Sequence, residues 1–297
     1  MKQEGFRSGF VSIIGRPNVG KSTLLNRILK EKISIISDKP QTTRNRIMGV
    51  LHLSGAQLVF LDTPGIHKPK FKLNQRMVRT ALNTLKEVDL ILFLVEAFDA
   101  PGPGDQFIME RLKGLSIPVF LVINKIDRVK KETLIPLIEQ CTRSFTFTEV
   151  VPVSALTGDN VDRLIEVIVK HLPEGQPLFP EDTITDQPLR FIAAEVIREK
   201  ILTRTHEEIP YSVAVVIEEF LEDPEKQRVT IRAVIYVERD SQKGIVIGKG
   251  GEMLKAVGTA ARLELEGLIG TKVYLELWVK VKKDWRGNES LLTEVGY

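Results

Sequence analysis

Two hydrophobic patterns alternate along the first part of the chain. Short, nearly continuous apolar runs are each followed by a stretch in which apolar residues recur every three or four positions. Continuous runs predict strands buried on both faces, and the wider spacing predicts amphipathic helices. Their alternation indicates a parallel sheet between helices, so we predict a doubly wound α/β domain over residues 1–172. The predicted strands are 9–15, 57–65, 89–97, 118–125 and 149–155, and the predicted helices are 21–30, 104–115 and 160–172.

The pattern stops at residues 173–188, which contain four prolines and four acidic residues without an apolar period. Proline fixes φ and offers no N–H group, so this stretch predicts a linker between two domains. Beyond it we predict a smaller α+β domain, residues 189–297, that ends in a basic tail. Its predicted elements are helices at 189–204 and 252–268 and strands at 211–220, 228–238 and 272–281.

Composition agrees with this division and limits the class of protein. A chain of 297 residues with 43% hydrophobic and 27% charged residues has room for two globular cores. The single cysteine, Cys141, excludes an internal disulfide, and no apolar run approaches the roughly 20 residues of a membrane-spanning helix. We therefore expect a cytosolic protein. Residues 181–297 hold 17 Lys and Arg against 21 Asp and Glu, so nucleic-acid binding there would need a local basic patch.

The stretch GRPNVGKS, residues 15–22, fits the pattern G-x-x-x-x-G-K-[ST] between a predicted strand and a predicted helix. In this context the backbone amides surround the phosphates of a nucleotide, Lys21 reaches the β- and γ-phosphates, and the Ser22 hydroxyl binds Mg²⁺. The residues expected to bind the nucleotide here are Gly15, Arg16, Pro17, Asn18, Val19, Gly20, Lys21, Ser22 and Thr23.

Later polar residues at strand ends predict the rest of this site. Asp62 in DTPG ends an apolar strand and supplies a carboxylate for the same Mg²⁺, while the Gly65 amide senses the γ-phosphate. In NKID, Asp127 accepts hydrogen bonds from N1 and the exocyclic amine of guanine, which adenine cannot offer. Asn124 and Lys125 brace the loop and pack on the base. The turn Ser154, Ala155, Leu156 would offer the Ala155 amide to the guanine carbonyl.

The motifs GRPNVGKS, QTTR (41–44), DTPG, NKID and SAL occur in this order, and the first domain resembles the P-loop GTPases of the Era-like branch. The resemblance implies the fold, GTP hydrolysis to GDP and phosphate, and a requirement for Mg²⁺. It also places a Mg²⁺ ligand in the TTR run, for which we favour Thr43 over Thr42. The expected metal ligands are then Ser22, Thr43 and Asp62, and the residues expected to act on the reaction are Lys21, Asn18, Thr43 and Gly65.

Ile66 follows DTPG, where a side chain that orients the attacking water would be useful, yet isoleucine makes no hydrogen bonds. In related GTPases with an apolar residue here, an asparagine of the phosphate loop helps to hold K⁺, and the resemblance assigns this role to Asn18. A fixed cation stabilises charge that develops in the transition state. As alternatives, Asn18 only stabilises the loop turn, or the charge comes from Arg16, Arg44, Arg46 or a partner.

In the second domain, Gly248, Lys249, Gly250 and Gly251 form a G-x-x-G loop before a long predicted helix. Alone, such a loop is a common flexible turn. The order of helix, two strands, short helix, loop, long helix and strand, however, resembles a type II KH domain, in which the loop clamps single-stranded RNA. The cations expected to contact RNA are Lys243, Lys249, Lys255, Lys280, Lys282, Lys283 and Arg286. For the tail, whose cations alternate near Trp278 and Trp285, an edge strand defended by lysines explains the pattern equally well.

Taken together, the two resemblances imply a monomeric switch that binds the 3′ end of small-subunit ribosomal RNA and acts in assembly of that subunit. Loose peripheral association with the inner membrane is implied by resemblance only. The alternative is a GTPase signalling switch whose second domain binds a protein or a membrane.

Overall fold

The computed structural model describes residues 5–69 and 71–297 and divides into two compact units. In the described part, unit 1 comprises residues 5–34, 43–69 and 74–186. Unit 2 comprises 35–42, 71–73 and 187–297. Among the described residues, no helix has the length and apolar character needed to cross a membrane.

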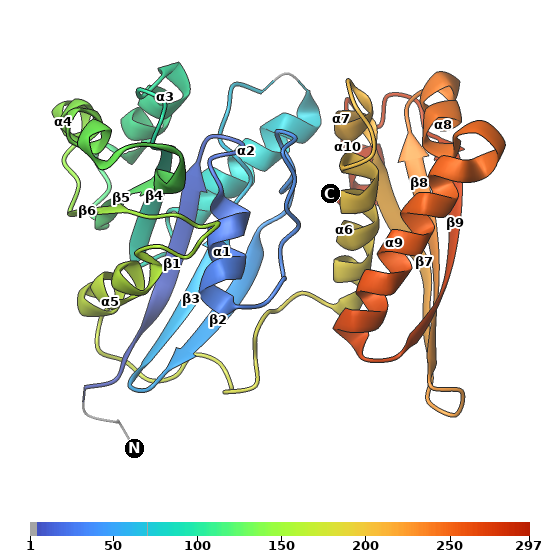
Figure 1. Ribbon diagram of the computed structural model, residues 1–297, viewed down its shortest axis with the longest axis horizontal. Coiled ribbons are helices and arrows are strands. Elements are labelled where there is room, and N and C mark those ends of the chain that lie inside the picture. Colours follow the sequence, from blue (N-terminus) through green and yellow to red (C-terminus); the bar gives the residue numbers. More distant parts are fainter. Residues whose placement is uncertain (1–4, 70) are drawn as a thin grey trace. The chain divides into compact units, whose positions relative to one another are not determined.

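Unit 1 contains a six-stranded sheet in the order β2-β3-β1-β4-β5-β6 (Figure 1). Every neighbouring pair is parallel except β2 with β3, which form an antiparallel hairpin. The strands are β1 (Arg7–Gly15), β2 (Ile47–Leu53), β3 (Ala56–Asp62), β4 (Leu90–Glu96), β5 (Val119–Asn124) and β6 (Glu149–Pro152). We did not predict β2, which is a mixed sequence interrupted by Gly49 and His52 rather than a continuous apolar run.

Helices cover both faces of this sheet (Figure 1). The helices are α1 (Lys21–Leu29), α2 (Lys72–Thr84), α3 (Pro103–Leu112), α4 (Leu134–Ser144) and α5 (Val161–His171). Apolar residues of α2, α3 and α4 pack in one cluster around central strand residues such as Phe93 and Leu121. All residues of β3 and β5 are buried, which explains why these strands read as continuous apolar runs. The predicted doubly wound α/β fold is confirmed.

The proline-rich stretch differs from the expected linker, because residues up to Asp186 belong to unit 1. Strand β2 lies at the edge of the sheet, and there the Val50 N–H donates to the Ile184 carbonyl oxygen at 2.8 Å. The Gln57 side chain accepts from the Leu178 and Phe179 N–H groups at 2.6 and 2.9 Å. The hydrogen bonds of the Val50 N–H and of the buried Gln57 side chain hold the proline-rich stretch against the sheet.

Unit 2 contains a three-stranded sheet in the order β7-β8-β9, with β7 antiparallel and β9 parallel to β8. The long helices α6 and α9 pack against one another and against the sheet (Figure 1). The elements are α6 (Leu189–Leu202), α7 (Ile209–Ser212), β7 (Ala214–Asp223), β8 (Arg228–Val237), α8 (Asp240–Ile247), α9 (Glu252–Ile269), β9 (Lys272–Val281) and α10 (Glu289–Glu294). This order confirms the predicted α+β arrangement of the second domain.

Candidate nucleotide site and nucleic-acid interface

The loop between β1 and α1 is shaped by residues with left-handed backbone. Gly20 has φ of 98° and Asn18 has φ of 68°. A Cβ atom on Gly20 would lie 2.2 Å from the Asn124 side-chain nitrogen, so only glycine fits there. The loop therefore curls in front of the first turn of α1, where N–H groups lack helical partners and form an anion-binding nest.

Lys21 is buried within this loop, with 6% of its surface exposed. Its ammonium group donates to the Arg16 carbonyl oxygen at 2.9 Å and lies 3.4 Å from that of Gly15. Burial lowers the pKa of Lys21 to about 8, although the Asp62 carboxylate opposes the shift. A desolvated cation ringed by amides is suited to phosphate oxygens, which restore the charge pairing that burial removes.

Hydroxyl groups surround a single buried carboxylate beside Lys21. The Ser22 hydroxyl donates to Asp62 Oδ2 at 2.7 Å and lies 2.8 Å from Thr43 Oγ1, and Ser34 also donates to Oδ2 at 3.0 Å. Burial raises the pKa of Asp62, and its Oδ1 has no hydrogen-bond partner among the described residues. An orphaned carboxylate oxygen beside hydroxyl oxygens fits a hard divalent cation such as Mg²⁺.

The structure brings Thr43, and not Thr42, to this cluster. The Thr42 hydroxyl instead donates to the Lys39 carbonyl oxygen at 2.6 Å. Ser34 was missed by sequence reasoning, because a lone serine 28 positions before Asp62 carries no motif.

The DTPG segment lies directly against the phosphate loop. A Cβ atom on Gly65 would lie 2.7 Å from the Pro17 nitrogen, and the Ile66 N–H donates to the Gly15 carbonyl oxygen at 3.1 Å. Ile66 is 1% exposed and packs in the core of unit 1. Its role is therefore packing, as its side-chain chemistry requires.

The predicted base-binding residues also come together. Asn124 donates to the Val19 carbonyl oxygen at 2.8 Å and accepts from the Ala155 N–H at 2.9 Å, so it joins the phosphate loop to the SAL turn. Lys125 donates to the Asn18 carbonyl oxygen at 2.8 Å and forms an ion pair with Glu96. Asp127 accepts from the Ser154 hydroxyl at 2.5 Å, and Leu156 is exposed.

In unit 2 the GKGG loop precedes α9, and three of its residues have positive φ: Gly248, Gly250 and Gly251. A Cβ atom on Gly248 would lie 2.7 Å from that of Met253, whereas the positions of Gly250 and Gly251 are open. Lys249 and Lys255 are exposed, and Lys243 is partly exposed. Glycines at an open helix start with flanking cations suit a sugar-phosphate backbone.

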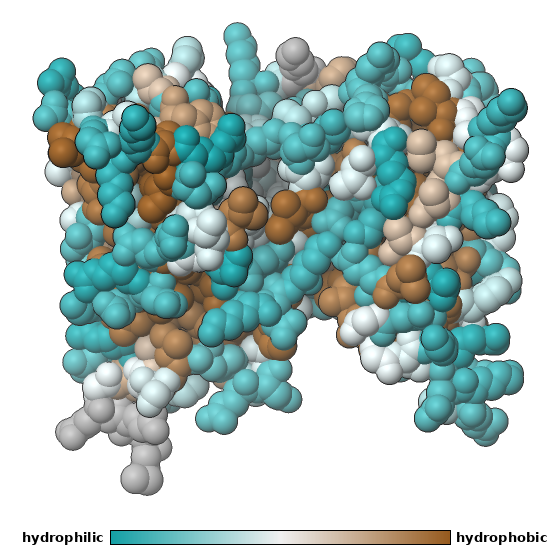
Figure 2. All heavy atoms as spheres, in the orientation of Figure 1, coloured by the Kyte–Doolittle hydropathy of each residue, from teal (hydrophilic) through white to brown (hydrophobic). Residues whose placement is uncertain are grey.

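A groove of about 400 Å³ continues from this loop between α9 and β9. It is lined by Gly251, Leu254, Lys255, Gly258, Thr259, Arg262, Leu275 and Leu277. Figure 2 shows apolar side chains exposed over α8 and α9 among mostly hydrophilic ones. Sequence reasoning missed the groove because its apolar residues have the spacing of an ordinary core face.

The tail does not extend this patch as expected. Leu275 and Leu277 face the groove, so alternation along β9 directs Lys280 to the opposite face of the sheet. Lys282 follows β9 and lies over the Tyr236 ring. Lys280 pairs with Glu218 at 3.3 Å, and Lys282 and Arg286 pair with glutamates elsewhere in unit 2. Lys283 is exposed.

The two tryptophans of the tail also differ from one another. Trp285 is fully buried and donates to the Ser212 carbonyl oxygen at 3.1 Å, which removes it from any stacking on bases. Trp278 is 43% exposed, on the same face of β9 as Lys280.

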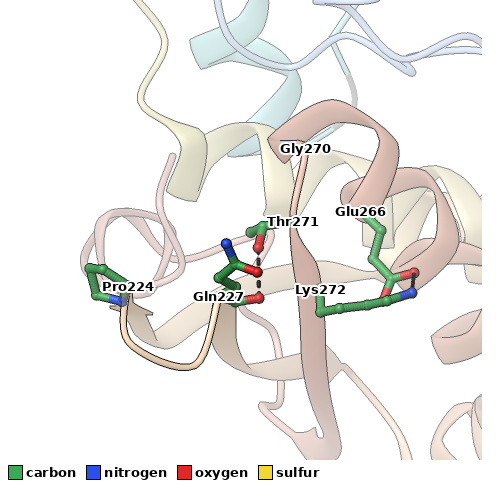
Figure 3. Close-up of a pocket in the computed structure, with 6 residues that line it drawn as sticks. All are labelled: Pro224, Gln227, Glu266, Gly270, Thr271 and Lys272. Carbon is green, nitrogen blue, oxygen red and sulfur yellow. Dashed lines mark hydrogen bonds and ion pairs between the residues drawn. The ribbon is translucent and has the colours of Figure 1, made fainter.

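A second cavity of unit 2 lies where α9 ends and β9 begins (Figure 3). Thr271 donates to the Gln227 carbonyl oxygen at 2.7 Å, and Lys272 lies 3.7 Å from the Glu266 carboxylate. These polar groups partner one another, so they are not arranged toward a ligand.

The phosphate loop, the hydroxyl–carboxylate cluster and the NKID carboxylate, all at the carboxyl ends of parallel strands, define a P-loop GTPase, here followed by a KH domain. Two family models match in agreement: "50S ribosome-binding GTPase" over residues 10–125 and "KH domain" over residues 208–286.

Relatives and solved structures then define the family. The chain is 57% identical to GTPase Era of Geobacter metallireducens and 60% identical to GTPase Era of Geotalea uraniireducens, each over 100% of both chains. A crystal structure of Era in complex with MgGDPNP and nucleotides 1506–1542 of 16S ribosomal RNA has a TM-score of 0.96 and 47% identity, covering 98% of this chain and 99% of that one. An Aquifex aeolicus Era variant bound to GDP and AlF₄⁻ has a TM-score of 0.95 and the same identity and coverage. The chain belongs to the Era family of GTPases.

Proposed function

We propose that this chain binds and hydrolyses GTP with Mg²⁺, binds the 3′ end of small-subunit ribosomal RNA through unit 2, and acts in assembly of that subunit. The observation that carries the nucleotide function is the convergence of Lys21, Ser22, Thr43 and the orphaned Asp62 oxygen beside a glycine-bounded loop. The RNA identity is supported by the relative that was crystallised with 16S ribosomal RNA. Peripheral membrane association stays a prediction.

Unit 1 would hold the triphosphate through the charge of Lys21 and through hydrogen bonds from backbone amides. The amides of residues 15–23 surround the phosphates, and Lys21 exchanges its two carbonyl partners for β- and γ-phosphate oxygens. Ser22, Thr43 and Asp62 would hold the Mg²⁺ ion, which neutralises charge on the β- and γ-phosphates. Gly65 lies against Pro17 of the phosphate loop, and its N–H group would donate to the γ-phosphate.

The base would be selected by Asp127. Its carboxylate is held by the Ser154 hydroxyl. The Ala155 N–H, which donates to Asn124 Oδ1 in this structure, would turn to the guanine carbonyl oxygen when the base binds. Adenine would leave the carboxylate without donors, and a mismatch of this kind discriminates by about 10⁴-fold or more. Leu156 and the stem of Lys125 would border the base.

Unit 2 would bind a single RNA strand along the GKGG loop and the groove. The loop offers its open glycines and Lys249 to phosphates, and Leu275 and Leu277 provide an apolar floor for bases. The RNA would then contact the face of β9 that is turned toward α9, where Lys255 lines the groove.

Nucleotide selectivity tests the function of unit 1. We expect the native protein to bind GTP at least about 10⁴-fold more tightly than ATP in competition with a fluorescent GDP analogue. Asp127→Asn replaces one of the two accepting oxygens by an amide donor, so it should weaken GTP binding and admit xanthosine triphosphate, whose C2 carbonyl accepts. Equal binding of ATP and GTP by the native protein contradicts the proposal.

A further inference from the structure

The Arg16 side chain, within the phosphate loop, ends in an acidic cup formed by Glu96, Asp99 and Asp105. Arg16 Nε donates to Asp105 Oδ1 at 2.9 Å, and Nη2 lies 4.0 Å from carboxylate oxygens of both Glu96 and Asp99. The Asp105 side chain is fully buried, whereas that of Arg16 is 27% exposed. Asp105 holds this guanidinium directly, while Asp99 and Glu96, which also pairs with Lys125, lie at the limit of an ion pair. With its guanidinium held in this way, Arg16 is poorly suited to act as a local arginine finger.

The start of α3 is built to receive this side chain. Asp105 accepts from the Gly102 N–H at 2.9 Å through Oδ2, which leaves Oδ1 for Arg16. A Cβ atom on Gly104 would lie 2.9 Å from Arg16 Cδ, so a glycine is needed where the arginine stem passes. The stretch PGPGD, residues 101–105, belongs to none of the nucleotide-site motifs, yet it binds and makes room for the Arg16 side chain.

The backbone around Arg16 touches the groups that meet a γ-phosphate. Its own carbonyl oxygen accepts from Lys21, and Gly15 before it accepts from the Ile66 N–H. Pro17 after it lies against Gly65. A shift of residues 15–17 would therefore displace the DTPG segment, whereas the remaining amides of the loop would still hold a β-phosphate.

We propose that Arg16 is a positioning residue whose anchor in the acidic cup sets the spacing between the phosphate loop and Gly65, and so supports the γ-phosphate of GTP specifically. This inference rests on the proposed nucleotide function. It predicts that loss of the anchor changes GTP binding and turnover while GDP binding is retained. A merely structural ion pair would affect both nucleotides alike.

The test measures GTP and GDP affinities, kcat and the unfolding temperature for Arg16→Gln, Asp105→Asn and Gly104→Ala. Asp105→Asn keeps the shape and removes the charge, and Gly104→Ala leaves both charges but pushes on the Arg16 stem. We expect kcat to fall about tenfold and GTP affinity about tenfold, with GDP affinity within about twofold of the native value. Arg16→Lys, which keeps one charged donor, should recover part of the loss.

Glu110→Gln is the matched control, since Glu110 also lies on α3 and pairs with Lys113 at the surface. It should behave as the native protein. Equal weakening of GTP and GDP, or unchanged GTP affinity and kcat in variants that fold, overturns the role of Arg16. If Arg16→Gln does not fold, Asp105→Asn and Gly104→Ala decide between the same outcomes. A native protein that binds neither guanine nucleotide overturns the proposed function instead.

Discussion

At the scale of single residues, the nucleotide site depends on backbone conformations that few side chains tolerate. Gly20, Asn18 and Lys125 all have positive φ, and these positions bring the phosphate loop and the NKID loop into contact. The Lys125 ammonium donates to the Asn18 carbonyl oxygen, and the Asn124 amide occupies the space that a Gly20 side chain would need. The left-handed backbone costs glycine nothing, whereas at Asn18 and Lys125 the surrounding hydrogen bonds offset its strain.

A catalytic role of Asn18, which we predict, can be tested separately from its place in the turn. Ile66 is buried in the core and cannot orient water, so we expect a fixed K⁺ ion to stabilise the negative charge that develops on the phosphates in the transition state. Turnover in KCl should then exceed turnover in NaCl by about tenfold or more at equal ionic strength. Asn18→Gly keeps the left-handed turn and removes the side-chain oxygen, so it should abolish the difference. Equal turnover of the native protein in both salts, or a K⁺ effect that survives Asn18→Gly, contradicts the prediction.

Residues fixed by a motif could be predicted from the sequence, and their long-range partners could not. Motif spacing singles out Lys21, Asp62 and Asp127, and their nearest polar partners in the structure are the Arg16 carbonyl oxygen, the Ser22 hydroxyl and the Ser154 hydroxyl, respectively. Asp105 and Glu96 lie near Arg16 because the sheet places β4, and α3 after it, beside β1, so no local sequence pattern predicts these contacts. A motif covers only neighbouring residues, so it cannot predict contacts between residues about 80 to 90 positions apart, such as those of Arg16.

At the scale of elements, the same distinction holds. Strands buried on both faces were predicted because burial alone determines their composition, as in β3 and β5. The edge strand β2 escaped prediction because Gly49 and His52 interrupt its apolar run. Its hydrogen bond to the proline-rich stretch is visible only in three dimensions. Trp285 likewise has the spacing of an exposed tail residue but is buried and donates to the Ser212 carbonyl oxygen.

The groove between α9 and β9 gives a prediction for RNA binding by this helix. Gly258 lies in the groove, 3.4 Å (measured from its ideal Cβ) from Leu277, whereas Gly267 on the same helix has open space around it. Gly258→Leu should fill the groove and weaken binding of a short single-stranded RNA about tenfold or more, measured by fluorescence anisotropy. Gly267→Leu is the control, since both changes favour the helix equally and only one reaches the groove. Equal affinities for the two variants contradict the assignment of this groove.

The two faces of β9 can be compared directly with charge-neutralising changes. Lys255→Gln removes a cation at the groove, and Lys280→Gln removes one from the opposite face, so net charge falls by the same amount in both. We expect Lys255→Gln to weaken RNA binding and to reduce the slope of log affinity against log salt by about one. Lys280→Gln should leave both quantities near their native values. Similar losses for both variants indicate that RNA also contacts the far face.

At the scale of the whole molecule, the chain itself joins the two functions. Unit 2 includes residues 35–42, where Arg198 of α6 donates to the Thr42 carbonyl oxygen at 2.6 Å and Glu199 accepts from the Ile36 N–H at 2.9 Å. The next residue, Thr43, lies beside Ser22 in unit 1. One peptide bond therefore separates a residue bound by unit 2 from a proposed Mg²⁺ ligand, which is a covalent route for coupling.

We accordingly predict that RNA bound at the GKGG loop raises GTP turnover or GTP affinity. RNA binding that steadies α6 would steady Thr42, and with it Thr43, in the arrangement that Mg²⁺ and the γ-phosphate favour. Steady-state turnover and GTP affinity of the full chain are measured with and without a short single strand, and a Lys249→Asp, Gly250→Asp double variant serves as the control that cannot respond. Linkage requires any gain in GTP affinity to appear as an equal gain in RNA affinity when GTP is present. No change in either quantity, or an equal change in the double variant, would exclude this coupling.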